Sequence, residues 1–148
     1  MRGLKDFEGR WRLDRTVRLA LEHVFEGEAT LTPDGGHHLW HEVGTMNLFG
    51  GESVRAERRY LWREAGPLIE VLYEDGRPFH AFDPNAPVTE VEHLCAPDTY
   101  RGRYDLSGFP RWRLSWDVRG PRKGYHSTTV YSRLEQSAPL GDTPANET

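Results

Sequence analysis

The chain has 148 residues, of which 36% are hydrophobic and 11% aromatic, and its net charge is −4 at pH 7. This length fits one domain with a core that is stable without cross-links, and the lone Cys95 excludes an intramolecular disulfide. Charges of both signs are interspersed without a basic block, which argues against a nucleic-acid partner. Residues 1–7 lack the apolar segment of a secretory signal and no long apolar run follows, so we expect a cytoplasmic protein without a membrane partner.

The chain opens with a predicted helical turn at residues 4–7, followed by a strand at residues 9–21. Within that strand Trp11, Leu13, Leu19 and Leu21 fall on every second position, which is the period of a strand with one buried face. A helix is the competing interpretation, because positions 13, 17, 21 and 24 also form an apolar stripe at helical spacing. The unbroken alternation favours the strand.

The rest of the chain predicts nine more strands, separated by turn residues such as Pro33-Asp34-Gly35-Gly36 and Asp75-Gly76. They cover residues 25–32, 38–46, 54–64, 68–73, 78–83, 89–95, 99–107, 112–119 and 125–134. The short links predict an all-β, antiparallel up-and-down barrel of about ten strands, because closure removes the free edges of an open sheet. We expect residues 1–135 to form this one domain and the polar tail 136–148 to be mobile.

Four charged residues fall in phase with the apolar face of their strands: Arg15, Glu42, Arg58 and Arg133. A charge on an inward face must be paired or solvated inside the barrel, because an isolated buried charge is very costly. These positions are therefore where the sequence predicts either structural ion pairs or ligand-binding groups.

The first predicted strand begins Gly9-Arg10-Trp11, and Arg133 lies near the end of the last strand. This combination resembles the calycins, the barrel superfamily of lipocalins and fatty-acid-binding proteins. The resemblance implies a calycin-like barrel in which Trp11 packs under Arg133 and closes one end, which cation–π attraction would stabilise. The chain departs from fatty-acid-binding proteins, whose last strand carries Arg-x-Tyr. Here that strand has Tyr131-Ser132-Arg133, and the order Arg58-Arg59-Tyr60 occurs on another strand.

Longer segments are similar to an uncharacterised bacterial family of small calycin-like barrels with no assigned activity. This resemblance supports the fold and implies no particular chemistry. The similar segments are Phe7-Glu8-Gly9-Arg10-Trp11, Arg58-Arg59-Tyr60-Leu61-Trp62, Asp75-Gly76-Arg77-Pro78-Phe79-His80, His93-Leu94-Cys95-Ala96-Pro97-Asp98-Thr99-Tyr100 and Gly120-Pro121-Arg122-Lys123.

Arg58 and Tyr60 share the inward face of one predicted strand. A guanidinium beside a phenol can bind a carboxylate or phosphate, because the planar fork of arginine matches two oxygens. The alternative is a structural ion pair between Arg58 and Glu42. Glu42 is otherwise a candidate acid or base with a raised pKa, and Arg15 is open to the same structural and functional interpretations.

His93 and Cys95 lie two positions apart and face the same side of their strand. His93 is a candidate hydrogen-bonding group of a pocket, with a metal site or a Cys–His nucleophile as alternatives. The other histidines show no zinc spacing, so no metal site is predicted. His80 is either a haem ligand at the barrel mouth or a structural histidine, which leaves the cofactor undetermined.

These features favour a carrier or sensor that binds a small, partly apolar, anionic ligand. A small enzyme (a lyase, isomerase or hydrolase) with inward Glu, His and Tyr as acid and base is one alternative. An interaction module with a filled barrel is another, since the inward rings can simply fill a core. The candidate ligand-binding residues are Arg58 and Tyr60 for the anion, Arg15, Glu42, His93 and Tyr104 for polar groups, and Trp116 and Tyr131 for the apolar wall.

Overall fold

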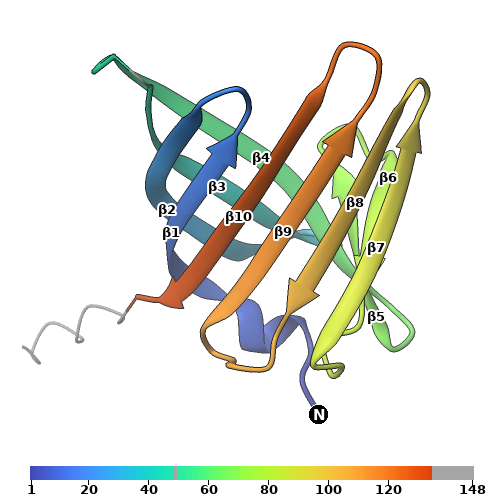
Figure 1. Ribbon diagram of the computed structural model, residues 1–148. Helices are drawn as coiled ribbons and strands as arrows, with labels where there is room; N and C mark the ends of the chain where they lie inside the picture. Colours follow the sequence, from blue (N-terminus) through green and yellow to red (C-terminus); the bar gives the residue numbers. More distant parts are fainter. Residues whose placement is uncertain (49, 135–148) are drawn as a thin grey trace, which may run out of the picture.

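The computed structural model describes residues 1–48 and 50–134, which form one ten-stranded antiparallel sheet behind a short 3₁₀ helix, η1 (Leu4–Phe7) (Figure 1). The tail predicted to be mobile lies outside the described residues. The strands are β1 (Gly9–Arg18), β2 (Glu22–Asp34), β3 (His37–Asn47), β4 (Ser53–Ala65), β5 (Leu68–Tyr73), β6 (Pro78–Phe82), β7 (Val88–Cys95), β8 (Asp98–Asp105), β9 (Trp112–Arg119) and β10 (Gly124–Arg133).

The strands follow one another around a nearly closed barrel, in the order β6-β5-β4-β3-β2-β1-β10-β9-β8-β7. Hydrogen-bonded pairing of β1 with β10 joins the first strand to the last. The edge strands β6 and β7 lie next to each other. Among the described strands, they are the one pair of consecutive strands that is not joined by a ladder of hydrogen bonds. The predicted all-β, up-and-down antiparallel barrel is therefore confirmed.

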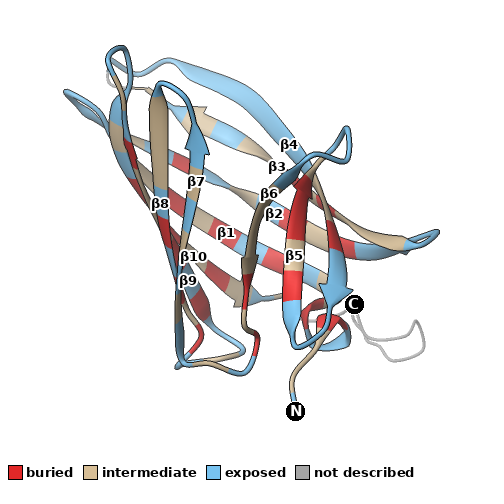
Figure 2. Cartoon of the chain, turned by 90° about the vertical axis from the view of Figure 1, so that its right-hand side faces the viewer, coloured by how far each residue is buried: buried red, intermediate tan, exposed pale blue. Residues whose placement is uncertain are grey.

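Alternation of buried with more exposed residues runs along most strands, as the sequence pattern predicted (Figure 2). β4 differs, because residues 53–59 are all exposed. In β1, Trp11 and Leu13 are buried, and Trp11 pairs with Ala29 of β2 and Arg133 of β10, which rules out the helix. The predicted extension of this strand to residue 21 is wrong. β1 ends at Arg18, and Leu19 and Leu21 in the following turn are 48% and 49% exposed.

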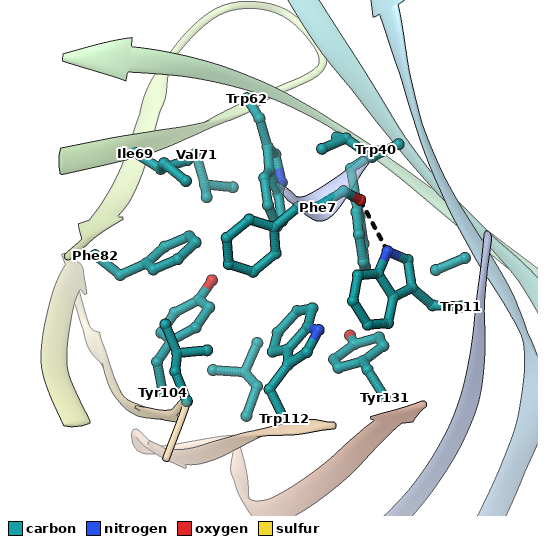
Figure 3. Close-up of a cluster of buried hydrophobic side chains, with 14 of the residues drawn as sticks. Phe7, Trp11, Trp40, Trp62, Ile69, Val71, Phe82, Tyr104, Trp112 and Tyr131 are labelled. Atoms are coloured by element: carbon teal, nitrogen blue, oxygen red, sulfur yellow. Dashed lines mark hydrogen bonds between the residues drawn. The ribbon is translucent and has the colours of Figure 1, made fainter. Parts of the chain in front are cut away.

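One end of the barrel is filled by Phe7, the last residue of η1 (Figure 3). Its ring is fully buried and meets those of Trp62, Phe82, Phe109 and Trp112 edge-on, with centroids 5.0 to 5.8 Å apart. Tilted and edge-on contacts are the favourable arrangements for aromatic pairs. The short helix thus plugs this end of the barrel, which we call the closed end.

Arg133 and Trp11 hold this plug in place. The Arg133 guanidinium carbon lies 4.0 Å from the centroid of the Trp11 ring, within the range of a cation–π contact. Arg133 Nη1 donates to the carbonyl of Glu8 at 2.6 Å, and its Nη2 donates to the carbonyl of Asp6. Trp11 Nε1 donates to the carbonyl of Phe7 at 2.9 Å, the dashed line in Figure 3. Both residues therefore satisfy carbonyls of the η1 segment.

Gly27 of β2 and Gly44 of β3 face each other where the two strands approach closely. A Cβ atom on Gly27 would lie 2.1 Å from the carbonyl oxygen of Val43, and one on Gly44 would lie 2.3 Å from that of Glu26. No side chain fits at such distances, so this close approach of β2 and β3 requires glycine on both strands.

Candidate functional site

The interior contains a cavity of about 330 Å³, a size at the lower end for small-molecule sites. Leu19, which is 48% exposed, belongs to its lining, so the cavity reaches solvent at the β1–β2 turn, at the end of the barrel away from η1 (Figure 1). We call this the open end. Nine of the cavity's nineteen lining residues are Phe, Tyr or Trp: Trp40, Tyr60, Trp62, Phe79, Tyr104, Trp112, Trp116, Tyr125 and Tyr131.

A buried ion pair occupies one side of the cavity. Arg15 Nη2 lies 2.9 Å from Glu42 Oε1, and the two side chains are 8% and 3% exposed. Glu42 Oε2 accepts hydrogen bonds from Trp40 Nε1 at 2.9 Å and from the Tyr131 hydroxyl at 2.7 Å. Arg15 Nε donates to Thr129 Oγ1 at 2.7 Å. Both carboxylate oxygens of Glu42 are therefore already engaged by the protein.

This network fixes the charge states of the pair. Burial alone would raise the pKa of Glu42, but the charges of Arg15 and Arg58 and the hydrogen bonds from Tyr131 and Trp40 outweigh it, so the pKa is lowered. Burial likewise opposes the charge of Arg15, and Glu42 overcomes it, so the pKa of Arg15 is raised. Glu42 is thus ionised at neutral pH, contrary to the raised pKa expected for an acid or base.

Arg58 lines the same cavity from β4, directly opposite Glu42 on β3. The alternative in which Arg58 pairs with Glu42 is replaced by the Arg15–Glu42 pair. Within residues 1–48 and 50–134, Arg58 makes no ion pair or side-chain hydrogen bond, and its side chain is exposed. Since Arg15 and Glu42 neutralise each other, Arg58 leaves the cavity with an excess positive charge.

His80 of β6 and Tyr104 of β8 form a second polar contact in the wall. His80 Nε2 lies 2.6 Å from the Tyr104 hydroxyl oxygen. Burial, with a smaller contribution from His93, lowers the pKa of His80 to about 3, so this imidazole is neutral at neutral pH. Burial raises the pKa of Tyr104 well above its ordinary value. His80 Nε2 is thus hydrogen-bonded to a neutral phenol.

The cavity brings together all but one of the eight predicted ligand-binding residues. The exception is His93, which is not among the lining residues. Its ring packs against those of Tyr73, Phe79 and Tyr100 at centroid distances of 5.8, 5.1 and 6.0 Å. The structure therefore places His93 in an aromatic cluster and not in the cavity lining, contrary to the prediction. The seven that line the cavity are Arg15, Glu42, Arg58, Tyr60, Tyr104, Trp116 and Tyr131.

The sequence pattern missed Phe79 as a lining residue because of a β-bulge. Val71 of β5 pairs with His80, and the next residue, Leu72, pairs with Pro78, so Phe79 is the extra residue. Phe79 and His80 are adjacent in sequence, yet both line the cavity. The ring of Phe79 stacks on that of Trp116 at 5.2 Å. Strict alternation assigns only one of two adjacent residues to the inner face, and no local sequence signal marks this bulge.

Two further properties concern metals and membranes. Across the described part of the chain, no three His, Cys, Asp or Glu side chains gather closely enough to hold a metal ion. Across the same residues, no helix has the length and apolar character that a membrane span requires.

The plugged barrel and its internal cavity define a calycin-like barrel with a small-molecule-sized site. The sequence matches the DUF6314 family, a family of unknown function, over residues 7–133, and the chain belongs to this family. No curated protein matches the sequence.

Two solved structures are similar to this chain and distant from it in sequence. The S-type phycobiliprotein lyase CPES from Guillardia theta is similar with a TM-score of 0.61 and 9% identity, over 90% of this chain and 92% of that chain. A redesigned β-barrel, mFAP1, bound to DFHBI, is similar with a TM-score of 0.44 and 11% identity, over 90% of this chain and 100% of that chain. At these identities the likeness to the lyase concerns the fold alone.

Proposed function

We propose that this protein is a carrier or sensor that binds a small, partly apolar, anionic molecule in the barrel cavity. The observation that carries this proposal is the free guanidinium of Arg58 in an aromatic wall whose other full charges, Arg15 and Glu42, neutralise each other. An aromatic ligand would pack against the rings, and its carboxylate or phosphate would accept hydrogen bonds from Arg58, with Tyr60 beside it on the same strand face.

The protonation states of the cavity support binding over acid–base catalysis. A catalytic acid or base works best with a pKa near the operating pH. Here the pKa of Glu42 is lowered, that of His80 is about 3, and those of Tyr104 and Tyr131 are raised well above ordinary values. The empty volume also favours a ligand over the filled barrel expected of an interaction module.

We place the protein in the cytoplasm, as the sequence predicts. The support is Cys95, which is an exposed free thiol. Such a group persists in a reducing compartment and is prone to oxidation outside one.

The test uses fluorene-2-carboxylate, a planar aromatic anion, and its neutral analogue fluorene-2-carboxamide, with affinities measured by isothermal titration calorimetry. Arg58→Met should weaken carboxylate binding ten- to hundredfold, since a hydrogen bond to a charged group contributes about 1.5–3 kcal/mol. Binding of the amide should change little. Arg59→Met is the matched control, because it removes the same charge from the adjacent, outward position of β4, where Arg59 pairs with Glu57 at 3.3 Å.

Circular dichroism of both variants checks that the barrel is intact. We expect Arg58→Met to fold, because Arg58 makes no ion pair or side-chain hydrogen bond with the described residues and its side chain is exposed. The proposal fails if wild-type protein does not bind the carboxylate. It also fails if Arg58→Met and Arg59→Met bind it equally well.

A further inference from the structure

Buried polar atoms without a partner are concentrated at the cavity. Among the described residues, three fully buried side-chain nitrogens lack a hydrogen-bond partner: His23 Nδ1, His80 Nδ1 and Trp112 Nε1. His80 and Trp112 both line the cavity. Buried polar groups in folded proteins are nearly always hydrogen-bonded, so an unpaired one in the wall of a cavity marks a position where a ligand can bind.

The His80–Tyr104 pair has more hydrogen-bond donors than its own contact uses. A neutral imidazole carries one N–H and a phenol carries one O–H, and the contact between Nε2 and the hydroxyl oxygen at 2.6 Å uses one of these two hydrogens. If Tyr104 donates, the Nδ1–H of His80 has no acceptor. If His80 donates through Nε2, the O–H of Tyr104 has no acceptor. In either tautomer the pair therefore retains one unused donor.

We propose that the His80–Tyr104 pair is a second ligand contact, which donates a hydrogen bond to an acceptor oxygen of the bound molecule. This inference rests on the proposed function and narrows the ligand class. The ligand would be a conjugated or aromatic anion that carries a carbonyl or comparable oxygen away from its charged group. Arg58 binds the charge and the pair binds the second oxygen.

The proposed ligand contact corresponds to the tautomer in which His80 donates to Tyr104 through Nε2. In that tautomer the atom left over on His80 is an acceptor, and the free donor is the Tyr104 hydroxyl, which points into the barrel interior (Figure 3). The ring of Tyr104 is held by stacking on Phe82 at 4.0 Å and on Trp112 at 6.1 Å. A donor fixed in this way would discriminate strongly, because a ligand without the acceptor leaves it unpaired.

The experiment compares fluorenone-2-carboxylate with fluorene-2-carboxylate, two probes with the same ring skeleton and charge that differ in one carbonyl oxygen. Wild-type protein should bind the ketone at least about tenfold more tightly in calorimetry. Tyr104→Phe should abolish this preference and leave the affinity for fluorene-2-carboxylate within about twofold of wild type, which also shows that the variant folds. His80→Gln provides a second variant that should reduce the preference by removing the group that orients the hydroxyl.

Tyr60→Phe is the matched control, because Tyr60 also presents a phenol to the cavity. It should affect both probes equally and preserve the ratio. The inference is overturned if wild-type protein binds both probes equally, or if the preference survives Tyr104→Phe. Both results differ from failure of the proposed function, in which fluorene-2-carboxylate does not bind or does not respond to Arg58→Met.

Discussion

Replacing one member of the buried Arg15–Glu42 pair should destabilise the protein far more than breaking an exposed pair of the same length. Glu42→Leu leaves the Arg15 guanidinium, 8% exposed, without its counter-ion, and removes the acceptor of Trp40 and Tyr131. An uncompensated buried charge costs about 3–5 kcal/mol. We expect Glu42→Leu to lower the free energy of unfolding by at least about 3 kcal/mol.

A double-mutant cycle isolates the pair itself. Arg15→Met should also be destabilising, while the double variant should cost less than the sum of the two single variants by at least about 2 kcal/mol, because neither charge is then left alone. The control cycle uses Arg10 and Glu28, which are also 2.9 Å apart but 46% and 54% exposed. Its coupling should be about 0.2–1 kcal/mol.

The assay is urea unfolding followed by tryptophan fluorescence and circular dichroism, with the free energy extrapolated to zero denaturant. A coupling energy for Arg15 and Glu42 no larger than that for Arg10 and Glu28 would refute the reasoning. Such a result would mean that the interior is wet enough to solvate both charges, and the distinction drawn between the paired Arg15 and the free Arg58 would lose its basis.

Three further predictions concern protonation and packing. The pKa of His80 is about 3 in the folded protein, below its ordinary value of 6.5. Between these two pH values unfolding therefore takes up a proton. The free energy of unfolding should fall as the pH decreases through this window, by at most about 1.4 kcal/mol per pH unit. His80→Gln should flatten this dependence in urea titrations at pH 4 to 7, and an unchanged slope would contradict the lowered pKa. Gly27→Ala should lower the free energy of unfolding by more than about 2 kcal/mol, because its Cβ would lie 2.1 Å from a backbone oxygen. Gly36→Ala, whose Cβ would have no atom within 4 Å, should change it by less than about 0.5 kcal/mol. Equal thermal midpoints for the two variants would argue against the close approach of β2 and β3. Phe7→Ala should cost about 3–5 kcal/mol in the same assay, and a loss below about 1 kcal/mol would mean that η1 does not plug the barrel.

Much of this fold follows from the sequence, because a strand with one buried and one solvent-exposed face must alternate apolar with polar residues. The predicted bounds of β5 and β9 match the structure, and the alternation places Trp112 and Tyr131 on the inner face where they are found. The end of β1 was missed, because Leu19 and Leu21 continue the alternating pattern into the β1–β2 turn at the open end, where the two side chains are about half exposed.

The site was predicted less completely, because its contacts depend on distances that a linear pattern does not contain. Arg58 is the direct neighbour of Glu42 across one strand pair, yet Glu42 pairs with Arg15, which reaches it from β1 across β2. His93 has the inward phase but meets a cluster of rings. Phe79 enters the cavity wall through a bulge that changes the local phase.

The central claim is that Arg58 binds the anionic group of a ligand held inside the barrel. A crystal structure of the protein with fluorene-2-carboxylate tests this most directly. We predict the ring system within the aromatic wall and both carboxylate oxygens within hydrogen-bond distance of the Arg58 guanidinium, with the Arg15–Glu42 pair unchanged. A probe bound on the outer surface, or a carboxylate directed away from Arg58, would contradict the claim.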